Sequence, residues 1–329
     1  MMNKDIKLCG IGNALVDMQF EVTDKEISDL GLEKGTMTLV VDDVQDTVLK
    51  MMGNRTKYVS SGGSAANTII AFSSFGGKAA YKTMIGEDED GVFYVDEFQD
   101  LGIILDAPID DDDHTGRCLV LITPDSERTM LTSLGATQNY KKDFVSDDLI
   151  KRSEWLYIEG YKLTDDIGYD AVLHACHVAK KYDTKIAVTF SDKFIIDLFK
   201  ERLNEIASLS DLIFCNESEG MAFTGTDTPE KALELLENSF KNIAFTRSAK
   251  GSIISWEGKH YNIPPYEAKA IDSTGAGDMY AGGFFYGLVY GKSIEKAGHL
   301  ASISASKVVS QHGARLKSSH TKLYSKIYS

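Results

Sequence analysis

Short apolar runs and longer amphipathic stretches alternate along most of the chain. The apolar runs are rich in Ile, Val, Phe and Tyr, which is typical of strands buried on both faces of a sheet. They predict strands at residues 6–11, 80–85, 155–160, 185–191, 211–216 and 242–247. Helical periodicity predicts helices at residues 64–75, 91–102, 170–182, 195–207 and 230–240. This alternation indicates βαβ units, so we expect an α/β fold with a mainly parallel sheet and helices on both faces.

The first predicted helix carries boundary signals at both ends. Ser64 stands where a side chain can cap the N-terminus of the helix, and Gly76 and Gly77 follow its last apolar residue. Serine is a preferred N-cap residue, and glycine commonly ends helices. We therefore expect Ser64 to cap this helix.

Two segments interrupt the α/β pattern. Residues 17–58 and 106–134 contain runs such as "GTMTLVV" and "RTMLTSL", which predict antiparallel strands inserted between the βαβ units. We expect these two segments to form a small lid domain, and residues 1–16, 59–105 and 135–329 to form a large catalytic domain. Ligands of open α/β sheets bind at the carboxyl ends of the strands, where such a lid would close over them to exclude water.

Composition and charge exclude several classes of function. The formal net charge of −14 argues against nucleic acid as a partner, because phosphate backbones require basic patches. No apolar run is long enough to span a membrane, and no signal peptide is evident, so we expect no membrane partner. The four cysteines are widely spaced and form no CxxC pair, which favours buried free thiols in a reducing cytoplasm.

The segment "DSTGAGD" at residues 272–278 carries the strongest chemical signal. The first backbone N–H groups of a helix lack intrahelical partners and attract anions, and the small residues Gly275, Ala276 and Gly277 would let an anion approach them. Asp278 would lie beside that anion as a base. An anion hole beside a base is what phosphoryl transfer to a hydroxyl requires. The alternative is a glycine-rich turn whose aspartate merely complements the helix dipole.

Two segments match nucleotide-binding motifs only in part, so we do not interpret them as nucleotide-binding sites. "GIGNAL" at residues 10–15 follows a strand, but Leu15 replaces the third glycine of a dinucleotide fingerprint. "GKS" at residues 291–293 follows a helix, and Tyr286 stands where a Walker A loop needs its first glycine. Neither segment supports hydride chemistry or a P-loop.

Three motifs in order resemble the ribokinase-like (PfkB) family of carbohydrate and nucleoside kinases. They are the glycine-rich stretch at residues 62–91, the "NESE" segment and "DSTGAGD". The resemblance runs from about residue 8 to residue 313 and implies the ribokinase-like fold and an ATP-dependent kinase. It also implies that Asn216 and Glu219 organise Mg²⁺ and phosphates through water.

The resemblance implies further roles on the phosphate side of the site. Asp278 corresponds to the catalytic base, and residues 275–277 correspond to the anion hole. Thr246 and Gly251 resemble the segment that lines the nucleotide, and Arg128 would reach the phosphates from the lid. Asp272 lies where members of the family hold a monovalent cation such as K⁺. Arg128 could instead be an ordinary surface arginine paired with its neighbour Glu127.

On the acceptor side, Asn13, Asp17, Gly63 and Asn67 correspond to groups that hold substrate hydroxyls. A carboxylate such as Asp17 can accept hydrogen bonds from two neighbouring hydroxyls. The resemblance thus implies a small hydroxylated substrate, whereas a monomer and a homodimer both remain open.

Within the family, "GIGNALVD" and "WLYIEGYKLT" resemble the adenosine-kinase branch. A nucleoside needs an apolar slot for its base, and Leu15, Leu39, Leu134 and Tyr161 are candidates, each of which could instead be core. Lys162 departs from that branch and would place a charge near the slot. A purine nucleoside is the favoured substrate, a sugar or sugar acid is the alternative, and a non-catalytic nucleotide-binding protein is a third possibility.

Overall fold

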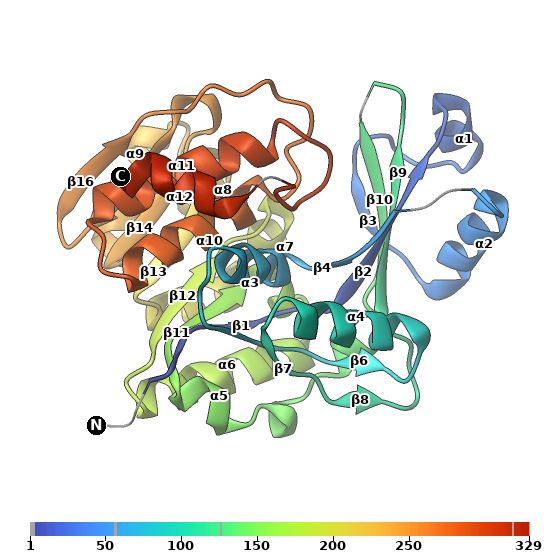
Figure 1. Ribbon diagram of the computed structural model, residues 1–329, viewed down its shortest axis with the longest axis horizontal. Helices are drawn as coiled ribbons and strands as arrows, with labels where there is room; N and C mark the ends of the chain where they lie inside the picture. Colours follow the sequence, from blue (N-terminus) through green and yellow to red (C-terminus); the bar gives the residue numbers. More distant parts are fainter. Residues whose placement is uncertain (1–3, 56–57, 126, 318, 329) are drawn as a thin grey trace.

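A nine-stranded sheet forms the centre of the protein (Figure 1). The computed structural model describes residues 4–55, 58–125, 127–317 and 319–328 of the 329-residue chain. Seven strands run parallel, and the last two, β15 and β16, are antiparallel. In spatial order the strands are β16 (Lys259–Ile263), β15 (Ser252–Trp256), β14 (Asn242–Thr246), β13 (Leu212–Asn216), β12 (Lys185–Thr189), β11 (Ser153–Glu159), β1 (Ile6–Ile11), β5 (Ala79–Lys82) and β7 (Ile104–Asp106). The expected ribokinase-like α/β architecture is confirmed.

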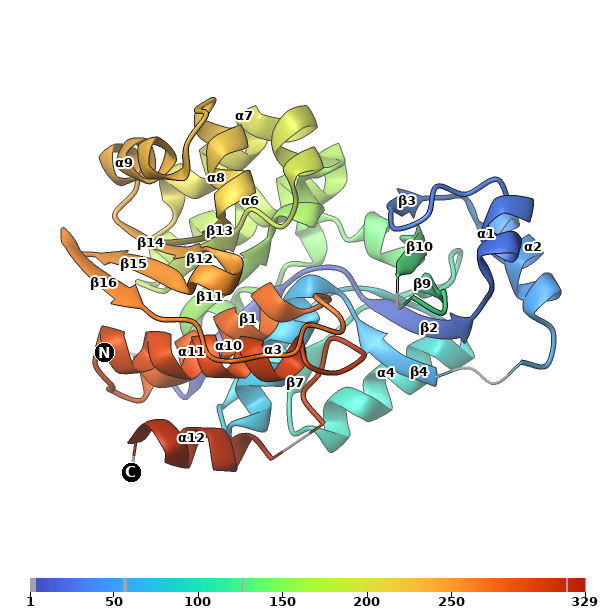
Figure 2. The same ribbon diagram turned by 90° about the horizontal axis from the view of Figure 1, so that it is seen from above.

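Helices cover both faces of this sheet (Figure 2). One face carries α3 (Ser64–Ser74), α4 (Glu89–Asp100), α10 (Ala276–Val289) and α11 (Ile294–Val308), with α12 (His320–Tyr328) packed on α11. The other carries α5 (Asp147–Lys151), α6 (Asp166–Lys181), α7 (Lys193–Leu209), α8 (Glu217–Thr224) and α9 (Pro229–Ser239). Short 3₁₀ segments lie at Gly135–Asn139, Lys142–Phe144, Gly160–Leu163 and Ser248–Lys250.

Strand β11 shows why the central residues of the parallel strands are apolar on both faces of the sheet. Trp155 and Tyr157 pack into the core on the α10 side, whereas Leu156 and Ile158 pack into the core on the α6 side. Because successive side chains of a strand point to opposite faces, a strand covered on both sides needs an apolar residue at every position. No helix among the described residues is long and apolar enough to cross a membrane.

A separate five-stranded sheet, here called the small sheet, stands beside the large one (Figure 1). In spatial order it contains β3 (Met37–Leu39), β10 (Arg128–Ser133), β9 (Gly116–Ile122), β2 (Leu15–Glu21) and β4 (Tyr58–Gly62). Helices α1 (Asp24–Asp29) and α2 (Asp42–Met52) flank it. The expectation of antiparallel strands is only partly right, because β2 pairs in parallel with β9 and β10 pairs in parallel with β3. Strands β2 and β9 both leave the large sheet in the same direction, with Leu15 opposite Gly116.

Two local predictions are wrong. The strand predicted at residues 80–85 is split into β5 and β6 (Ile85–Gly86), and β6 pairs with β8 (Ile109–Asp110) in a sheet of its own. Ser64 does not cap α3, because the N-cap is Gly63 with φ 101°. A Cβ on Gly63 would lie 2.2 Å from the Asn13 carbonyl oxygen, so both its conformation and its packing require glycine.

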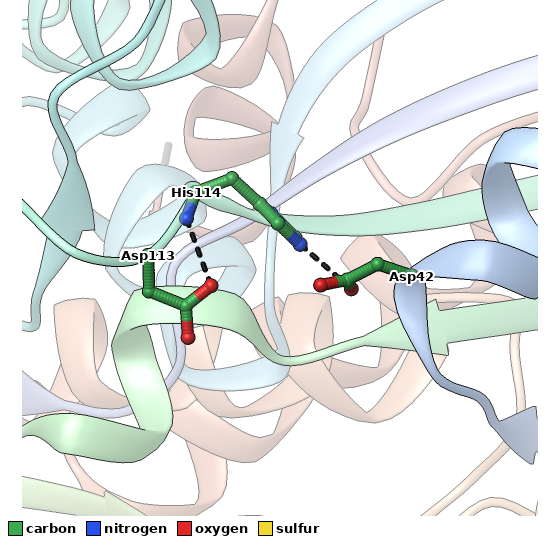
Figure 3. Close-up of side chains that lie close together, drawn as sticks. All are labelled: Asp42, Asp113 and His114. Carbon is green, nitrogen blue, oxygen red and sulfur yellow. Dashed lines mark hydrogen bonds and ion pairs between the residues drawn. The ribbon is translucent and has the colours of Figure 1, made fainter.

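His114 joins helix α2 to the loop before β9 (Figure 3). Its Nε2 lies 2.7 Å from Asp42 Oδ1, and its Nδ1 lies 2.6 Å from the Thr115 carbonyl oxygen. A carbonyl oxygen and an ionised carboxylate can only accept, so both ring nitrogens must donate, as in the imidazolium form. Burial and Arg117 lower the pKa of His114, but the hydrogen bonds to Thr115 and Asp42 outweigh them and raise it. Asp113 accepts the backbone N–H of His114 and lies beside the pair.

The His114–Asp42 contact is expected to weaken as the pH rises. Because the folded-state pKa of His114 is raised, its contribution to stability is complete below about pH 6.5 and disappears as the pH rises through the raised value. The contact is partly exposed, so we expect it to contribute at most about 1 kcal/mol.

Hydrogen exchange of the α2 amides measures this effect. After correction for intrinsic exchange, the opening free energy of α2 should fall between pH 6 and pH 8.5 in the wild type. This free energy should be independent of pH in His114→Gln. The control His177→Gln, at an exposed position on α6, should keep the wild-type pH dependence. An unchanged pH dependence in His114→Gln would contradict the assignment.

Candidate active site

A cavity of about 380 Å³ lies at the carboxyl ends of β11, β12, β13 and β14. The N-termini of α3 and α10 form one wall, and side chains of the small sheet, such as Met37 and Met130, form another. This is the place where open α/β sheets bind ligands. Most residues selected from the sequence line it, namely Asn13, Leu15, Leu39, Gly63, Asn67, Leu134, Tyr161, Asn216, Glu219, Thr246, Gly275, Ala276, Gly277 and Asp278.

Asp278 lies in the first turn of α10 and faces α3. The Ser64 hydroxyl donates to its Oδ1 at 2.7 Å, and the Asn67 amide donates to its Oδ2 at 3.3 Å. Burial raises the pKa of Asp278 to about 7, although these two hydrogen bonds oppose the rise. The carboxyl can therefore gain or lose a proton near neutral pH.

The glycines beside Asp278 serve different purposes. Gly275 is the N-cap of α10 with φ 72°, and a Cβ there would lie 2.6 Å from Ala314, so backbone conformation and packing both require glycine. A Cβ on Gly277 would meet nothing within 4 Å, and Gly277 is exposed to the cavity. The cavity thus reaches the N-terminal backbone of α10, where partial positive charge favours anions.

Glu159 is a site residue that the sequence analysis missed. It ends β11 and lines the cavity, and its carboxylate accepts the backbone N–H groups of Asn13 and Ala65, each at 2.7 Å. Ala65 lies in the first turn of α3, so Glu159 caps this helix from another element. Burial raises the pKa of Glu159 to about 6, against the effect of the two backbone donors. A Cβ on Gly12 would lie 2.7 Å from the Glu159 carboxylate, so this position requires glycine. That glycine is the only local sequence signal for the contact with Glu159.

Asn216 and Glu219 form a capping box at the start of α8. The Asn216 side chain accepts the Glu219 N–H at 2.9 Å and donates to Glu219 Oε1 at 2.6 Å, and Glu219 Oε2 accepts the Asn216 N–H at 3.0 Å. Burial raises the pKa of Glu219 to about 7. Each oxygen of Glu219 accepts one donor within the box and keeps an acceptor site for a water molecule, so this pair fits Mg²⁺ held through water.

Asp17, Arg128 and Gly251 do not line the cavity. Asp17 packs against β4, where a Cβ on Gly62 would lie 2.4 Å from its Oδ1. Burial raises the pKa of Asp17 to about 7, with Arg315 and Arg128 opposing the rise. Asp17 is thus a partly buried carboxyl at the base of the small sheet.

Arg128 connects the small sheet to the loop before α10. It forms a buried ion pair with Asp272, with Nη2 2.7 Å from Oδ2, so its partner is not Glu127. Asp272 also accepts the N–H groups of Thr274 at 3.0 Å and Gly313 at 2.8 Å. The Arg128 guanidinium therefore places a positive charge beside Asp272, the residue expected to hold a monovalent cation.

Two expectations about single residues need correction. Lys162 does not place its charge near the slot, because its ammonium is buried outside the cavity lining and donates to the Thr137 carbonyl at 2.7 Å. Burial lowers the pKa of Lys162 to about 8. Gly251 has φ 85°, and a Cβ there would lie 2.1 Å from the Ile263 carbonyl oxygen, so it serves the turn before β15.

Buried carboxyls with raised pKa values should make the protein more stable at mildly acid than at mildly alkaline pH. The pKa values of Asp17, Glu219 and Asp278 are raised to about 7, and the pKa of Glu159 is raised to about 6. Because the unfolded-state values are lower, the folded protein binds more protons, and the stability gained is lost as the pH rises through the folded values.

Urea unfolding at constant ionic strength tests this sign. The free energy of unfolding should fall between pH 5.5 and pH 8, and the slope should be smaller in Asp278→Asn. Glu201→Gln, on the exposed side of α7, should keep the wild-type slope. A slope that Asp278→Asn leaves intact would show that Asp278 does not titrate in this range.

Comparison with known proteins agrees with the fold and the cavity. The model of the pfkB family of carbohydrate kinases matches residues 36–322. The chain is 29% identical to an adenosine kinase of Saccharomyces cerevisiae (87% of this chain, 89% of the relative). It is 28% identical to a 5-dehydro-2-deoxygluconokinase of Bacillus subtilis (78% and 82%). The crystal structure of adenosine kinase from Sinorhizobium meliloti superposes with a TM-score of 0.90 at 31% identity (98% and 99%). The chain therefore belongs to the pfkB family of carbohydrate kinases and is a kinase of a nucleoside or a sugar.

Proposed function

We propose that the protein transfers the γ-phosphoryl group of ATP to the 5′-hydroxyl of adenosine or a related purine nucleoside. The observation that carries this proposal is the composition of the cavity. Its lining includes several apolar side chains together with Asp278, and its charged side chains are carboxyls. The likeness to adenosine kinases of yeast and Sinorhizobium supports the same substrate class.

The apolar slot suits a flat base. Leu15, Leu39 and Leu134 border the cavity near the small sheet, and Tyr161 faces it from the end of β11. The ring of Phe194 lies 5.9 Å from that of Tyr161 and also borders the cavity. Aromatic and branched side chains bury a purine well, whereas a free sugar offers no apolar surface to fill such a slot.

The charge of the lining favours an uncharged acceptor. Four carboxyls, Glu159, Asp192, Glu219 and Asp278, line the cavity. Within the described parts of the chain, no lysine, arginine or histidine does so. On the acceptor side, a sugar acid would place its carboxylate near Glu159 and Asp278, whereas the phosphates of ATP would lie at the N-terminus of α10 with Mg²⁺, so the acid acceptor alone would lack a positive partner. The lining therefore disfavours the sugar-acid alternative that the Bacillus relative represents.

In the proposed reaction, Asp278 accepts the proton of the 5′-hydroxyl as its oxygen forms the bond to the γ-phosphorus and ADP leaves. A pKa near 7 suits a base at neutral pH, because the ionised form is populated and still basic. The N–H groups of Gly275 and Gly277 would face the transferred phosphoryl group and stabilise its charge, whereas the Ala276 N–H donates to the Ser273 carbonyl oxygen at 3.2 Å. Mg²⁺, when bound, neutralises charge on the phosphates, and Asn216 and Glu219 would hold it through water.

The remaining residues would bind the two substrates. Asn13, Gly63 and Asn67 line the acceptor side and would hold the ribose hydroxyls together with Asp17, which the small sheet would bring closer on closing. Thr246 lines the nucleotide side. Closing of the small sheet would also move Arg128, whose guanidinium could then pass from Asp272 to the phosphates.

Asp278→Asn tests the role of the base. Loss of a general base should lower kcat with adenosine and MgATP by roughly 10²–10⁴-fold, while calorimetric adenosine binding stays within a few-fold of wild type. Asp197→Asn, a partly exposed aspartate on α7, should retain full activity. Wild-type activity in Asp278→Asn would refute the mechanism, and wild-type protein that binds nucleotide but releases no ADP with adenosine or with any sugar or sugar acid would indicate a non-catalytic binding protein.

A further inference from the structure

The Ser64 hydroxyl is directed at Asp278 because α3 does not use it as a cap. Gly63 is the N-cap residue and no side chain caps the helix locally. Ser64, the first residue of the helix, donates instead to Asp278 Oδ1 at 2.7 Å, and it lines the cavity. The amide of Asn67, in the same first turn of α3, donates to Oδ2 at 3.3 Å. Each oxygen of the Asp278 carboxyl therefore has one donor from α3.

The position of α3 relative to Asp278 is fixed by contacts on both sides. Glu159 holds the first turn of α3 through the Ala65 N–H at 2.7 Å. Helices α3 and α10 also touch closely, since a Cβ on Gly282 would lie 2.6 Å from Ala71 Cβ and 2.8 Å from the Thr68 carbonyl oxygen. Neither helix can shift along the other without a steric clash, so the distance between Ser64 and Asp278 is set by the packing.

We propose that Ser64 is a positioning residue that holds Asp278 in the orientation and ionised state in which it accepts the proton of the substrate hydroxyl. The inference rests on the proposed function, in which Asp278 is the base. A donor to the ionised carboxyl favours that form. A hydroxyl can also rotate from donor to acceptor when Asp278 gains a proton, whereas the Asn67 amide nitrogen can only donate. Ser64 can thus stay bonded through the whole proton transfer.

The test is the pH dependence of kcat in Ser64→Ala. The variant should lower kcat by about 10–100-fold with little change in the KM for adenosine, because a charge-assisted hydrogen bond is lost. The acid limb of its profile should move to higher pH, since the ionised base has lost a donor. Ser64→Thr, which keeps the hydroxyl, should restore the wild-type kcat and the wild-type acid limb. Ser74→Ala, at the other end of α3, should match the wild type.

Separate outcomes distinguish this inference from the proposed function. If Asp278→Asn is inactive but Ser64→Ala keeps the wild-type acid limb, Ser64 does not position the base and only this inference is overturned. If Asp278→Asn keeps its activity, Asp278 is not the base and the proposed mechanism fails, whereas wild-type protein that does not phosphorylate adenosine would overturn the proposed substrate. In the Asp278→Asn background, Ser64→Ala should cause no further loss of kcat, whereas an additive loss would mean that Ser64 acts elsewhere. Should Ser64→Ala fold poorly, Ser64→Gly removes the same hydroxyl and provides the comparison.

Discussion

The site depends on one physical constraint, which is that carboxyl groups are placed in a buried cavity and must be held by backbone and side-chain donors. Glu159 accepts two backbone N–H groups, and Asp278 accepts one donor on each oxygen. Burial raises the pKa of both groups, but the donors keep the charged forms accessible near neutral pH. A base that is ionised yet still able to take a proton follows from this balance.

The large sheet creates the place where these groups can meet. Its parallel strands end at one edge, and the crossover connections direct the N-termini of the helices towards the same edge. Helix α3 follows β4 of the small sheet and helix α10 follows the loop after β16, and both present their first turns to the same cavity. Glu159 links the end of β11 to the start of α3, so the sheet and the acceptor side of the site are held together.

Much of the fold could be predicted from the sequence because local signals there coincide with burial. The central residues of the parallel strands are largely apolar since helices cover both faces, and "DSTGAGD" combines a left-handed Gly275 with the first turn of α10. The missed features depend on partners far away in the sequence. Ser64 looks like a cap locally, yet Gly63 takes that role, and the contacts of Glu159 and Lys162 involve residues that no local pattern specifies. The mixed pairing of the small sheet likewise joins strands far apart in the sequence, β2 with β9 and β3 with β10.

The central claim is that an uncharged purine nucleoside, and not a sugar acid, is the phosphoryl acceptor. The most direct measurement is a competition in one reaction that contains the wild-type protein, MgATP, adenosine and 2-keto-3-deoxygluconate, with the products identified by ³¹P NMR. The apolar slot and the carboxylate lining predict that the 5′-monophosphate of adenosine accumulates and the sugar acid stays unmodified. A phosphorylated sugar acid with unmodified adenosine would contradict the account, although it would leave Asp278 and the N-terminus of α10 in their proposed places.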